Sequence, residues 1–325
     1  MALKDVYEPY FALGAAITMR DLEVYSDLIT EHFSSVTCGN AMKPERVYDK
    51  PWDFAPTEAD RLANFARKHQ LTMRGHTIVW HQQTPEWFFT EEDTSDYVDE
   101  ACLLNRMTKH LQRMTERYGD ILSCWDLVNE AVADRGDEVL RPSPWRDILG
   151  DDYLVKVFKR AKDTVDLPLF YNDYNGCQAQ KRAKILQVLD QLKAEGVLPD
   201  GIGIQGHWQL NWPSLDEVKQ TIESYAAYDI PIHITELDLS IYPTREAEEM
   251  AFTKKLEEIQ AKRYEELFKL FRTYSKEIEN VTFWGVADGM TWLDNFPQKG
   301  RKNYPLLFDA EGELKLAGKR LLAIE

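Results

Sequence analysis

Two stretches of the sequence each place a glutamate at or near the end of an apolar, strand-like run. Residues 123–130 read Ser-Cys-Trp-Asp-Leu-Val-Asn-Glu and end at Glu130, and residues 230–238 read Ile-Pro-Ile-His-Ile-Thr-Glu-Leu-Asp and contain Glu236. Either carboxylate alone could simply cap the helix that follows it. Together they suit cleavage of a glycosidic bond, because one group must protonate the leaving oxygen while the anomeric carbon is attacked from the other side.

Three polar residues at the ends of predicted strands could support that chemistry. Asn129 precedes Glu130, and its amide could bind a sugar hydroxyl, although asparagine is also common in turns at strand ends. His207 and Asp238 could hold a neighbouring carboxylate ionised and oriented. A single histidine at a strand end is more often a structural hydrogen-bonding group, and the neighbouring acidic residues favour the catalytic interpretation.

Two further patterns match the residue types of cofactor sites but not the secondary structure that such sites need. His76 and His81 are five residues apart, so on a strand their side chains would point to opposite faces, and we expect no metal there. Residues 201–206 match G-x-G-x-x-G, but the glycines lie inside a strand-like run and no helix follows. Glycines inside a strand allow a neighbouring side chain or ligand to approach closely, and we expect that role here. We therefore predict that the protein uses no cofactor.

Several of the nine tryptophans are placed where they could contact a sugar. Four lie at or just beyond predicted strand ends: Trp80, Trp208, Trp284 and Trp292. Flat aromatic faces stack on the apolar C–H faces of sugar rings. Trp125 and Trp145 fit better as core residues.

The chain alternates short apolar strands with amphipathic helices. The predicted strands are residues 11–17, 34–40, 72–80, 123–130, 167–174, 201–208, 231–238 and 281–288. The predicted helices are residues 57–69, 95–118, 145–163, 179–195, 214–227, 245–274 and 314–323, and Ser214 with Glu217 forms a capping box. Eight strands with intervening helices favour an α/β fold, a single (β/α)8 TIM barrel, over an open doubly wound sheet. We expect residues 1–325 to form one catalytic domain with no appended binding module.

Composition excludes some classes of partner. The formal charge is 39 − 55 = −16, so nucleic acid and anionic membranes are poor partners. No run is long and apolar enough to cross a membrane, and the N-terminus lacks a signal core, which leads us to expect a cytoplasmic protein. The four cysteines, Cys38, Cys102, Cys124 and Cys177, are expected to be free buried thiols. The oligomeric state stays open.

Seven motifs occur in an order that resembles glycoside hydrolase family 10, the (β/α)8 endo-β-1,4-xylanases. They are residues 39–43 (GNAMK), 75–81 (GHTIVWH), 125–130 (WDLVNE), 171–175 (YNDYN), 203–207 (GIQGH), 234–238 (ITELD) and 284–288 (WGVAD). The resemblance extends over the whole chain. It implies retaining hydrolysis of β-1,4-xylosidic bonds in xylan and xylo-oligosaccharides, and it is closest to the intracellular bacterial branch.

The resemblance also implies roles for individual residues. Glu130 would be the acid/base and Glu236 the nucleophile, and His207 and Asp238 would support the nucleophile. The implied substrate-binding residues are Asn40, Lys43, His76, Trp80, Gln83, Asn129, Tyr174, Gln205, Trp284 and Trp292. Among these, Asn40 and Lys43 would hold the sugar at subsite −2, Tyr174 would lie on the leaving-group side, and Trp292 would help to exclude the hydroxymethyl group of glucose.

The sequence departs from the family pattern at two positions. Gly39 stands where family members usually carry glutamate, and Leu293 follows the last cleft tryptophan where arginine or another polar residue is usual. Without that glutamate we expect weaker binding of the sugar at subsite −2, so that Gly39→Glu would improve cleavage of an aryl xylobioside. The other explanation is that the backbone here needs a positive φ, which glycine allows. Two alternatives to a xylanase stay open: a retaining β-1,4-glycanase of the same barrel type acting on another sugar, and a sugar-binding barrel that has lost catalysis. A metal-dependent hydrolase on the same barrel is a more distant third.

Overall fold

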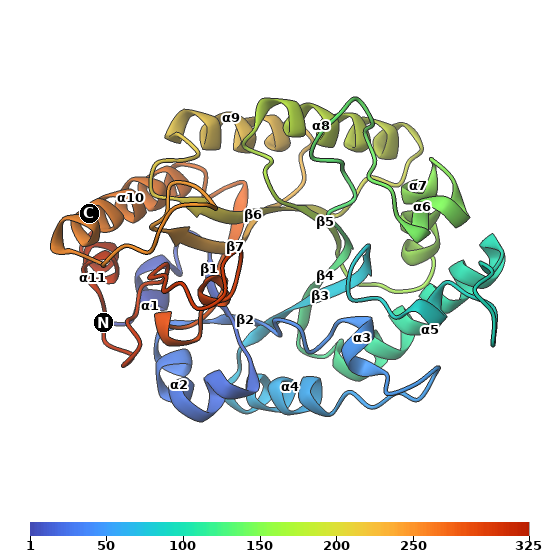
Figure 1. The fold of residues 1–325 in the computed structure, drawn as a ribbon, viewed down its shortest axis with the longest axis horizontal. Coiled ribbons are helices and arrows are strands. Elements are labelled where there is room, and N and C mark those ends of the chain that lie inside the picture. The colour runs from blue at the N-terminus through green and yellow to red at the C-terminus, as the bar shows by residue number, and fades with distance from the viewer. Residues whose placement is uncertain (325) are drawn as a thin grey trace. The chain divides into compact units, whose positions relative to one another are not determined.

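The computed structural model describes residues 1–324 and has a closed barrel with strand order β1 to β8 (Figure 1). The strands are β1 Ala12–Ala16, β2 Ser35–Thr37, β3 Thr72–Trp80, β4 Leu122–Asn129, β5 Leu169–Asp173, β6 Gly201–Gln209, β7 Ile232–Ser240 and β8 Ile278–Phe283. The pairings β1–β2, β1–β8, β3–β4, β4–β5 and β7–β8 are all parallel. The fold is therefore the predicted (β/α)8 TIM barrel, and each predicted strand overlaps an observed one.

Helices connect the strands. The α-helices are α1 Leu3–Tyr7, α2 Met19–His32, α3 Pro44–Val47, α4 Thr57–His69, α5 Glu100–Tyr118, α6 Pro144–Leu149, α7 Tyr153–Lys162, α8 Ala179–Ala194, α9 Leu215–Ala226, α10 Lys254–Thr273 and α11 Leu316–Leu322. Three short 3-10 helices are η1 Glu86–Phe88, η2 Asp288–Met290 and η3 Trp292–Asp294. The capping box of Ser214 and Glu217 at the start of α9 is confirmed.

The helix predictions were wrong in several places. The predicted helix 95–118 begins only at Glu100, and α1 and α3 were not predicted. The predicted helix 145–163 is two helices, because Gly150 ends α6 with a φ of 87°, outside the helical region. The predicted helix 245–274 begins only at Lys254, where Thr253 accepts a hydrogen bond from the Leu256 N–H. Helix α2 was not predicted, since its buried face is only Asp21, Tyr25 and Ile29.

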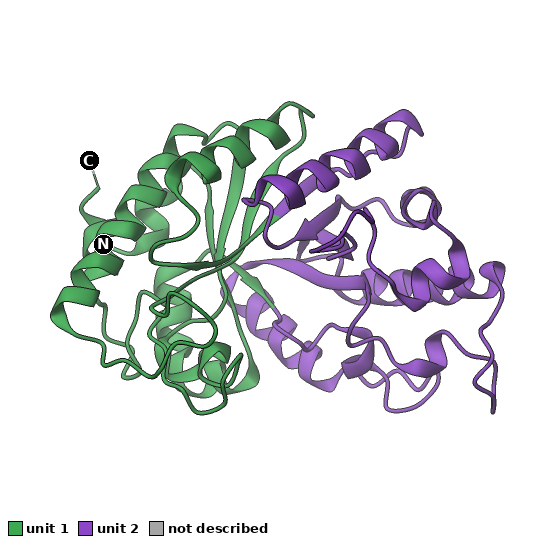
Figure 2. Ribbon diagram, turned by 45° about the horizontal axis from the view of Figure 1, so that its top comes forward, with its two compact units in different colours: residues 1–37, 204–325 green, residues 38–203 purple. Residues whose placement is uncertain are grey.

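The chain divides into two compact units, which Figure 2 colours separately. Unit 1 consists of residues 1–37 and the chain from residue 204 onward. Its core includes Phe268, whose ring lies 5.0 Å from Tyr7 and 5.9 Å from Phe283. The Tyr7 hydroxyl also donates to the Leu321 carbonyl oxygen at 2.9 Å, which joins α1 to α11.

Unit 2 consists of residues 38–203. Trp125 and Trp145 are buried in it, as predicted. A Cβ atom added at Gly201 would come within 2.1 Å of the Phe170 ring, and one added at Gly203 within 2.1 Å of Asn172. The glycines of β6 therefore allow close approach by neighbouring side chains, and the structure confirms that the dinucleotide pattern at residues 201–206 is a strand.

Three details of the sequence interpretation need correction. Trp208 lies inside β6 and is 2% exposed, so it packs in the core near Phe271 and does not face a sugar. Cys38 follows β2 and does not belong to it. All four cysteines are free, but Cys102 is only half-buried, because it lies in the first turn of α5.

Within residues 1–324, no helix combines the length and the apolar character that a bilayer crossing requires.

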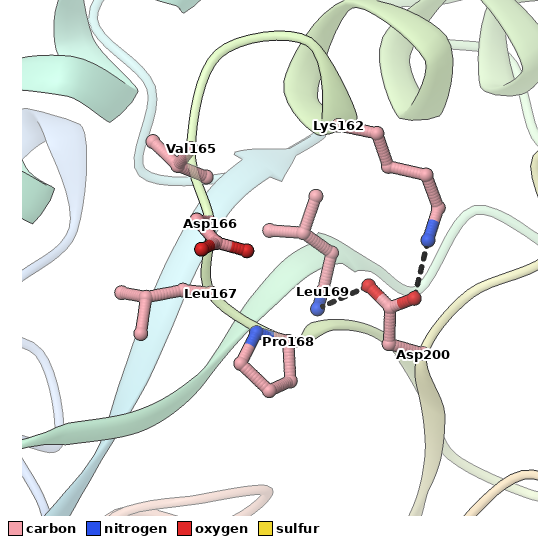
Figure 3. Close-up of a pocket in the computed structure, with 7 residues that line it drawn as sticks. All are labelled: Lys162, Val165, Asp166, Leu167, Pro168, Leu169 and Asp200. Atoms are coloured by element: carbon pink, nitrogen blue, oxygen red, sulfur yellow. Dashed lines mark hydrogen bonds and ion pairs between the residues drawn. The ribbon is translucent and has the colours of Figure 1, made fainter.

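Unit 2 has a surface hollow of about 440 Å³, which Figure 3 shows with the residues that line it. It lies at the amino-terminal ends of β5 and β6, whereas active sites of such barrels form at the carboxyl ends. Asp200 forms an ion pair with Lys162 and accepts a hydrogen bond from the Leu169 N–H at 3.0 Å. These contacts fix the turn between α7 and β5, and we assign the hollow no catalytic role.

Candidate active site

Glu130 and Glu236 share an unusual backbone conformation. Glu130 directly follows β4 with a φ of 58°, and Glu236 lies within β7 with a φ of 60°. Positive φ is uncommon for residues other than glycine and costs on the order of 1 kcal/mol, and such conformations are concentrated at functional sites. The β7–β8 pairing shifts its register between Ile234 and Leu237, on either side of Glu236. Both glutamates thus depart from regular strand geometry.

In unit 2, tryptophan and lysine side chains organise the surroundings of Glu130. The Trp80 indole Nε1–H donates to Glu130 Oε2 at 2.9 Å. Lys43 is 4% exposed, and its ammonium group lies 4.4 Å from the centre of the Trp80 ring. Lys43 donates to Asn40 Oδ1 at 2.7 Å and to Gln83 Oε1 at 2.9 Å. The structure therefore brings together these five predicted site residues.

A buried charged group lies next to His76. His76 Nδ1 is 2.9 Å from Asp126 Oδ2, and Arg74 Nη2 is 2.5 Å from Asp126 Oδ1. Burial alone would raise the pKa of Asp126, but Arg74 and His76 outweigh it and lower that pKa to about 2. Asp126 is therefore an anion that orients the His76 ring. Sequence reasoning missed this role, although a charged residue inside an apolar strand was a visible signal.

Asn129 and Tyr174 are also held by neighbouring side chains. Asn172 Nδ2 donates to Asn129 Oδ1 at 2.8 Å, which orients the Asn129 amide. The Tyr174 hydroxyl donates to Asp134 and accepts a hydrogen bond from Arg141 Nη2 at 3.0 Å. Asp134 and Arg141 belong to the segment after Glu130 and were not predicted from the sequence.

In unit 1, His207 lies between two carboxylates. Its Nε2 is 3.0 Å from Glu236 Oε2 and its Nδ1 is 2.9 Å from Asp238 Oδ2. Burial lowers the pKa of His207, but Asp238 and Glu236 outweigh it and raise that pKa to about 10. At neutral pH the ring is a cation that donates from both nitrogens, so Glu236 is held as an anion with a fixed orientation.

Aromatic rings complete this group in unit 1. The Trp292 Nε1–H donates to Asp238 Oδ2 at 2.8 Å, and its ring lies 4.9 Å from the His207 ring. The Trp284 ring lies 6.2 Å from His207. Gln205 is buried in β6. The structure therefore joins His207, Asp238, Glu236 and both tryptophans in one cluster.

The raised pKa of His207 gives a prediction about stability and pH. A proton bound more tightly by the folded state stabilises it fully below the unfolded pKa, near 6.5, and this stabilisation is lost as pH rises through about 10. We expect the free energy of unfolding to fall by a few kcal/mol, at most about 1.4 kcal/mol per pH unit. Urea titrations at pH 6 and pH 9.5 measure this. His207→Asn should show a shallower slope, and an equal slope would contradict the assignment.

Gly39 has a φ of 41°, in the region that favours glycine. The structure therefore favours a backbone reason for this departure from the family pattern. We expect Gly39→Glu to destabilise the protein by about 1 kcal/mol without improving cleavage of an aryl xylobioside. Gly39→Ala is the control, because it adds the same strain without a carboxylate. Improved kcat/KM for the bioside with Gly39→Glu alone would instead show that the missing carboxylate weakens sugar binding.

The structure is a (β/α)8 barrel with one glutamate directly after β4 and another on β7, and polar and aromatic neighbours hold each of them. This arrangement is typical of glycoside hydrolases. The sequence profile of Glycosyl hydrolase family 10 matches residues 2–323. The chain belongs to this family.

Curated relatives are similar over nearly the whole length. The chain is 42% identical over 313 residues to endo-1,4-beta-xylanase B of Paenibacillus barcinonensis, covering 95% of this chain and 94% of that protein. It is 43% identical over 328 residues to endo-1,4-beta-xylanase A of Caldicellulosiruptor saccharolyticus, covering 99% and 95% of the two chains.

Solved structures share the fold. The crystal structure of xylanase XynB from Paenibacillus barcinonensis, complexed with a conduramine derivative, has a TM-score of 0.94 at 41% identity and covers 98% of this chain and 97% of that one. A mutant protein solved in complex with xylotriose has a TM-score of 0.95 at 42% identity, with 99% of both chains covered. These likenesses agree with the family assignment.

Proposed function

We propose that this protein is an endo-β-1,4-xylanase that hydrolyses xylan and xylo-oligosaccharides with retention of anomeric configuration. Membership of family 10 and the xylanase names of its relatives support the substrate. The observation that carries the mechanism is the pairing of Glu236 with a cationic His207, itself held by Asp238. A carboxylate kept ionised and oriented in this way is suited to nucleophilic attack.

The first step forms a covalent intermediate. Glu236 attacks the anomeric carbon of the xylose unit at the cleavage point, and the bond to the leaving oxygen breaks. Glu130 donates its proton to that oxygen, and the Trp80 indole N–H fixes the orientation of the Glu130 carboxyl through Oε2.

The second step releases the sugar. Glu130, now ionised, removes a proton from water, and the water oxygen attacks the anomeric carbon and displaces Glu236. His207 remains protonated, because its pKa of about 10 lies well above neutral pH. It can therefore stabilise Glu236 as a leaving carboxylate in this step as well as a nucleophile in the first.

The other site residues, around Glu130 and around Glu236, would bind the substrate. Lys43 presents an ammonium group between the Asn40 and Gln83 oxygens and above Trp80, which suits the hydroxyls of a sugar at subsite −2. Trp292 and Trp284 offer aromatic faces beside the nucleophile cluster. His76, Asn129, Gln205 and Tyr174 complete the set of binding residues that we propose.

The alternative, a retaining β-glycanase on another sugar, is tested by matched aryl glycosides. We expect kcat/KM for aryl xylobioside to exceed that for aryl cellobioside by about tenfold or more, because each unfavourable group in a closed pocket changes binding by about 1–3 kcal/mol. Equal or reversed values would overturn the xylan assignment. A protein that releases no reducing sugar from xylan at all would instead be a sugar-binding barrel.

A further inference from the structure

Two aromatic side chains among residues 1–324 are more than a third exposed: Tyr97, at 50%, and Phe296, at 45%. Tyr97 lies in the segment between β3 and α5. Phe296 follows η3 and stacks almost parallel on Trp292, with ring centres 5.2 Å apart and planes at 17°. Trp292 in turn contacts His207, the partner of Glu236. Phe296 therefore continues outward an aromatic surface that begins beside the proposed nucleophile.

A cationic side chain lies beside this exposed ring. The guanidinium carbon of Arg245 is 5.7 Å from the centre of the Phe296 ring. The Arg245 carbonyl oxygen accepts hydrogen bonds from Gln298 Nε2 at 3.0 Å and from Arg301 Nη1 at 3.1 Å. The segment after Phe296 thus fixes the backbone of Arg245 and places its guanidinium next to the ring.

The Arg245 guanidinium also has N–H groups that can donate hydrogen bonds to a ligand. Its segment carries acidic residues, but the part of the chain that the structure describes contains no carboxylate within ion-pair distance of Arg245. Nearby, Lys302 pairs with Asp294 at 2.5 Å, so those two charges are already matched. Phe296 and Arg245 together present an apolar face and several N–H donors on one exposed surface.

We propose that Phe296 and Arg245 form a further sugar-binding subsite, which takes an additional xylose unit from chains longer than xylobiose. The proposal rests on the xylanase function proposed above. The C–H face of a pyranose packs on an aromatic ring, and the Arg245 guanidinium donates hydrogen bonds to its hydroxyls. Because Trp292 covers one face of Phe296, the sugar contacts the part of the side chain that remains exposed.

The competing explanation is that Phe296 only supports Trp292, which donates to Asp238. Loss of such support would disturb the cluster of His207, Glu236 and Asp238. It would therefore lower activity on every substrate, whatever its length. A subsite acts only when the substrate is long enough to reach it. Chain-length dependence therefore separates the two explanations.

The test compares unbranched xylohexaose with an aryl xylobioside for wild type, Phe296→Ala, Arg245→Met and Tyr97→Ala. We expect Phe296→Ala to lower the ratio of kcat/KM for xylohexaose to that for the bioside about three- to tenfold, chiefly through KM. Arg245→Met should lower the same ratio about two- to fivefold. Tyr97→Ala, the matched exposed aromatic in unit 2, should leave both values unchanged.

Two results would overturn the subsite. An equal loss on both substrates would show that Phe296 only supports Trp292, and an unchanged ratio in both variants would show that the surface binds no sugar. Calorimetry on the Glu236→Ala background gives a second readout, since Phe296→Ala should weaken binding of xylohexaose more than binding of xylotriose. If the wild type cleaves neither xyloside, the proposed function fails instead, which is a distinct outcome.

Discussion

Replacing Glu236 by alanine should abolish hydrolysis of both xylan and dinitrophenyl xylobioside, by about 10⁴-fold or more in kcat. No covalent intermediate can form without this carboxylate, and a better leaving group does not compensate. Initial rates on both substrates measure the loss. Glu236→Gln should lose comparable activity, because it keeps the size and polarity of the side chain but removes the nucleophilic oxygen.

Controls separate loss of chemistry from loss of structure. Glu311→Ala removes an exposed glutamate of the same unit and should retain full activity. Azide added to Glu236→Ala should give an α-xylosyl azide, because the small anion occupies the vacated space and attacks once, with inversion. A β-azide from this variant would mean that Glu236 is the acid/base and that the two roles are exchanged.

Replacing Glu130 by alanine should have a different signature. General acid assistance contributes about 10²–10⁴-fold, and we expect a loss of this size in kcat on xylan, whose leaving group needs a proton. Dinitrophenyl xylobioside leaves without one, so the glycosyl-enzyme should still form rapidly, seen as a burst of dinitrophenol. Azide should then rescue turnover and give a β-xylosyl azide. The absence of a burst in a folded variant would contradict the acid/base role.

The fold class could be predicted because alternating apolar strands and amphipathic helices are a local property of the sequence. The ends of the strands were predicted less accurately, because a strand ends where its neighbour stops pairing. For example, β2 stops at Thr37, three residues before the predicted end. Helix α2 was missed because charged residues interrupt its apolar face. Trp208 was misplaced because β6 extends past it to Gln209, which leaves its ring in the core.

The candidate site was predictable where it depended on residue type and position along a strand. The glutamates, His207 and Asp238 are of this kind. What the sequence could not reveal depends on contacts between distant segments, such as the ion pair of Arg74 with Asp126 and the contact of Arg141 with Tyr174. The left-handed backbone of Glu130 and Glu236 also had no sequence signal, because glycine, the usual residue in that conformation, is absent at both positions.

The stereochemistry of the first product tests the retaining mechanism most directly. Proton NMR during hydrolysis of xylohexaose follows the anomeric signals of the newly formed reducing end before mutarotation. Double displacement through Glu236 predicts that the β-anomer appears first and the α-anomer only later. If the α-anomer appears first, water attacks the sugar directly, Glu236 is not a nucleophile, and the mechanism proposed here is wrong.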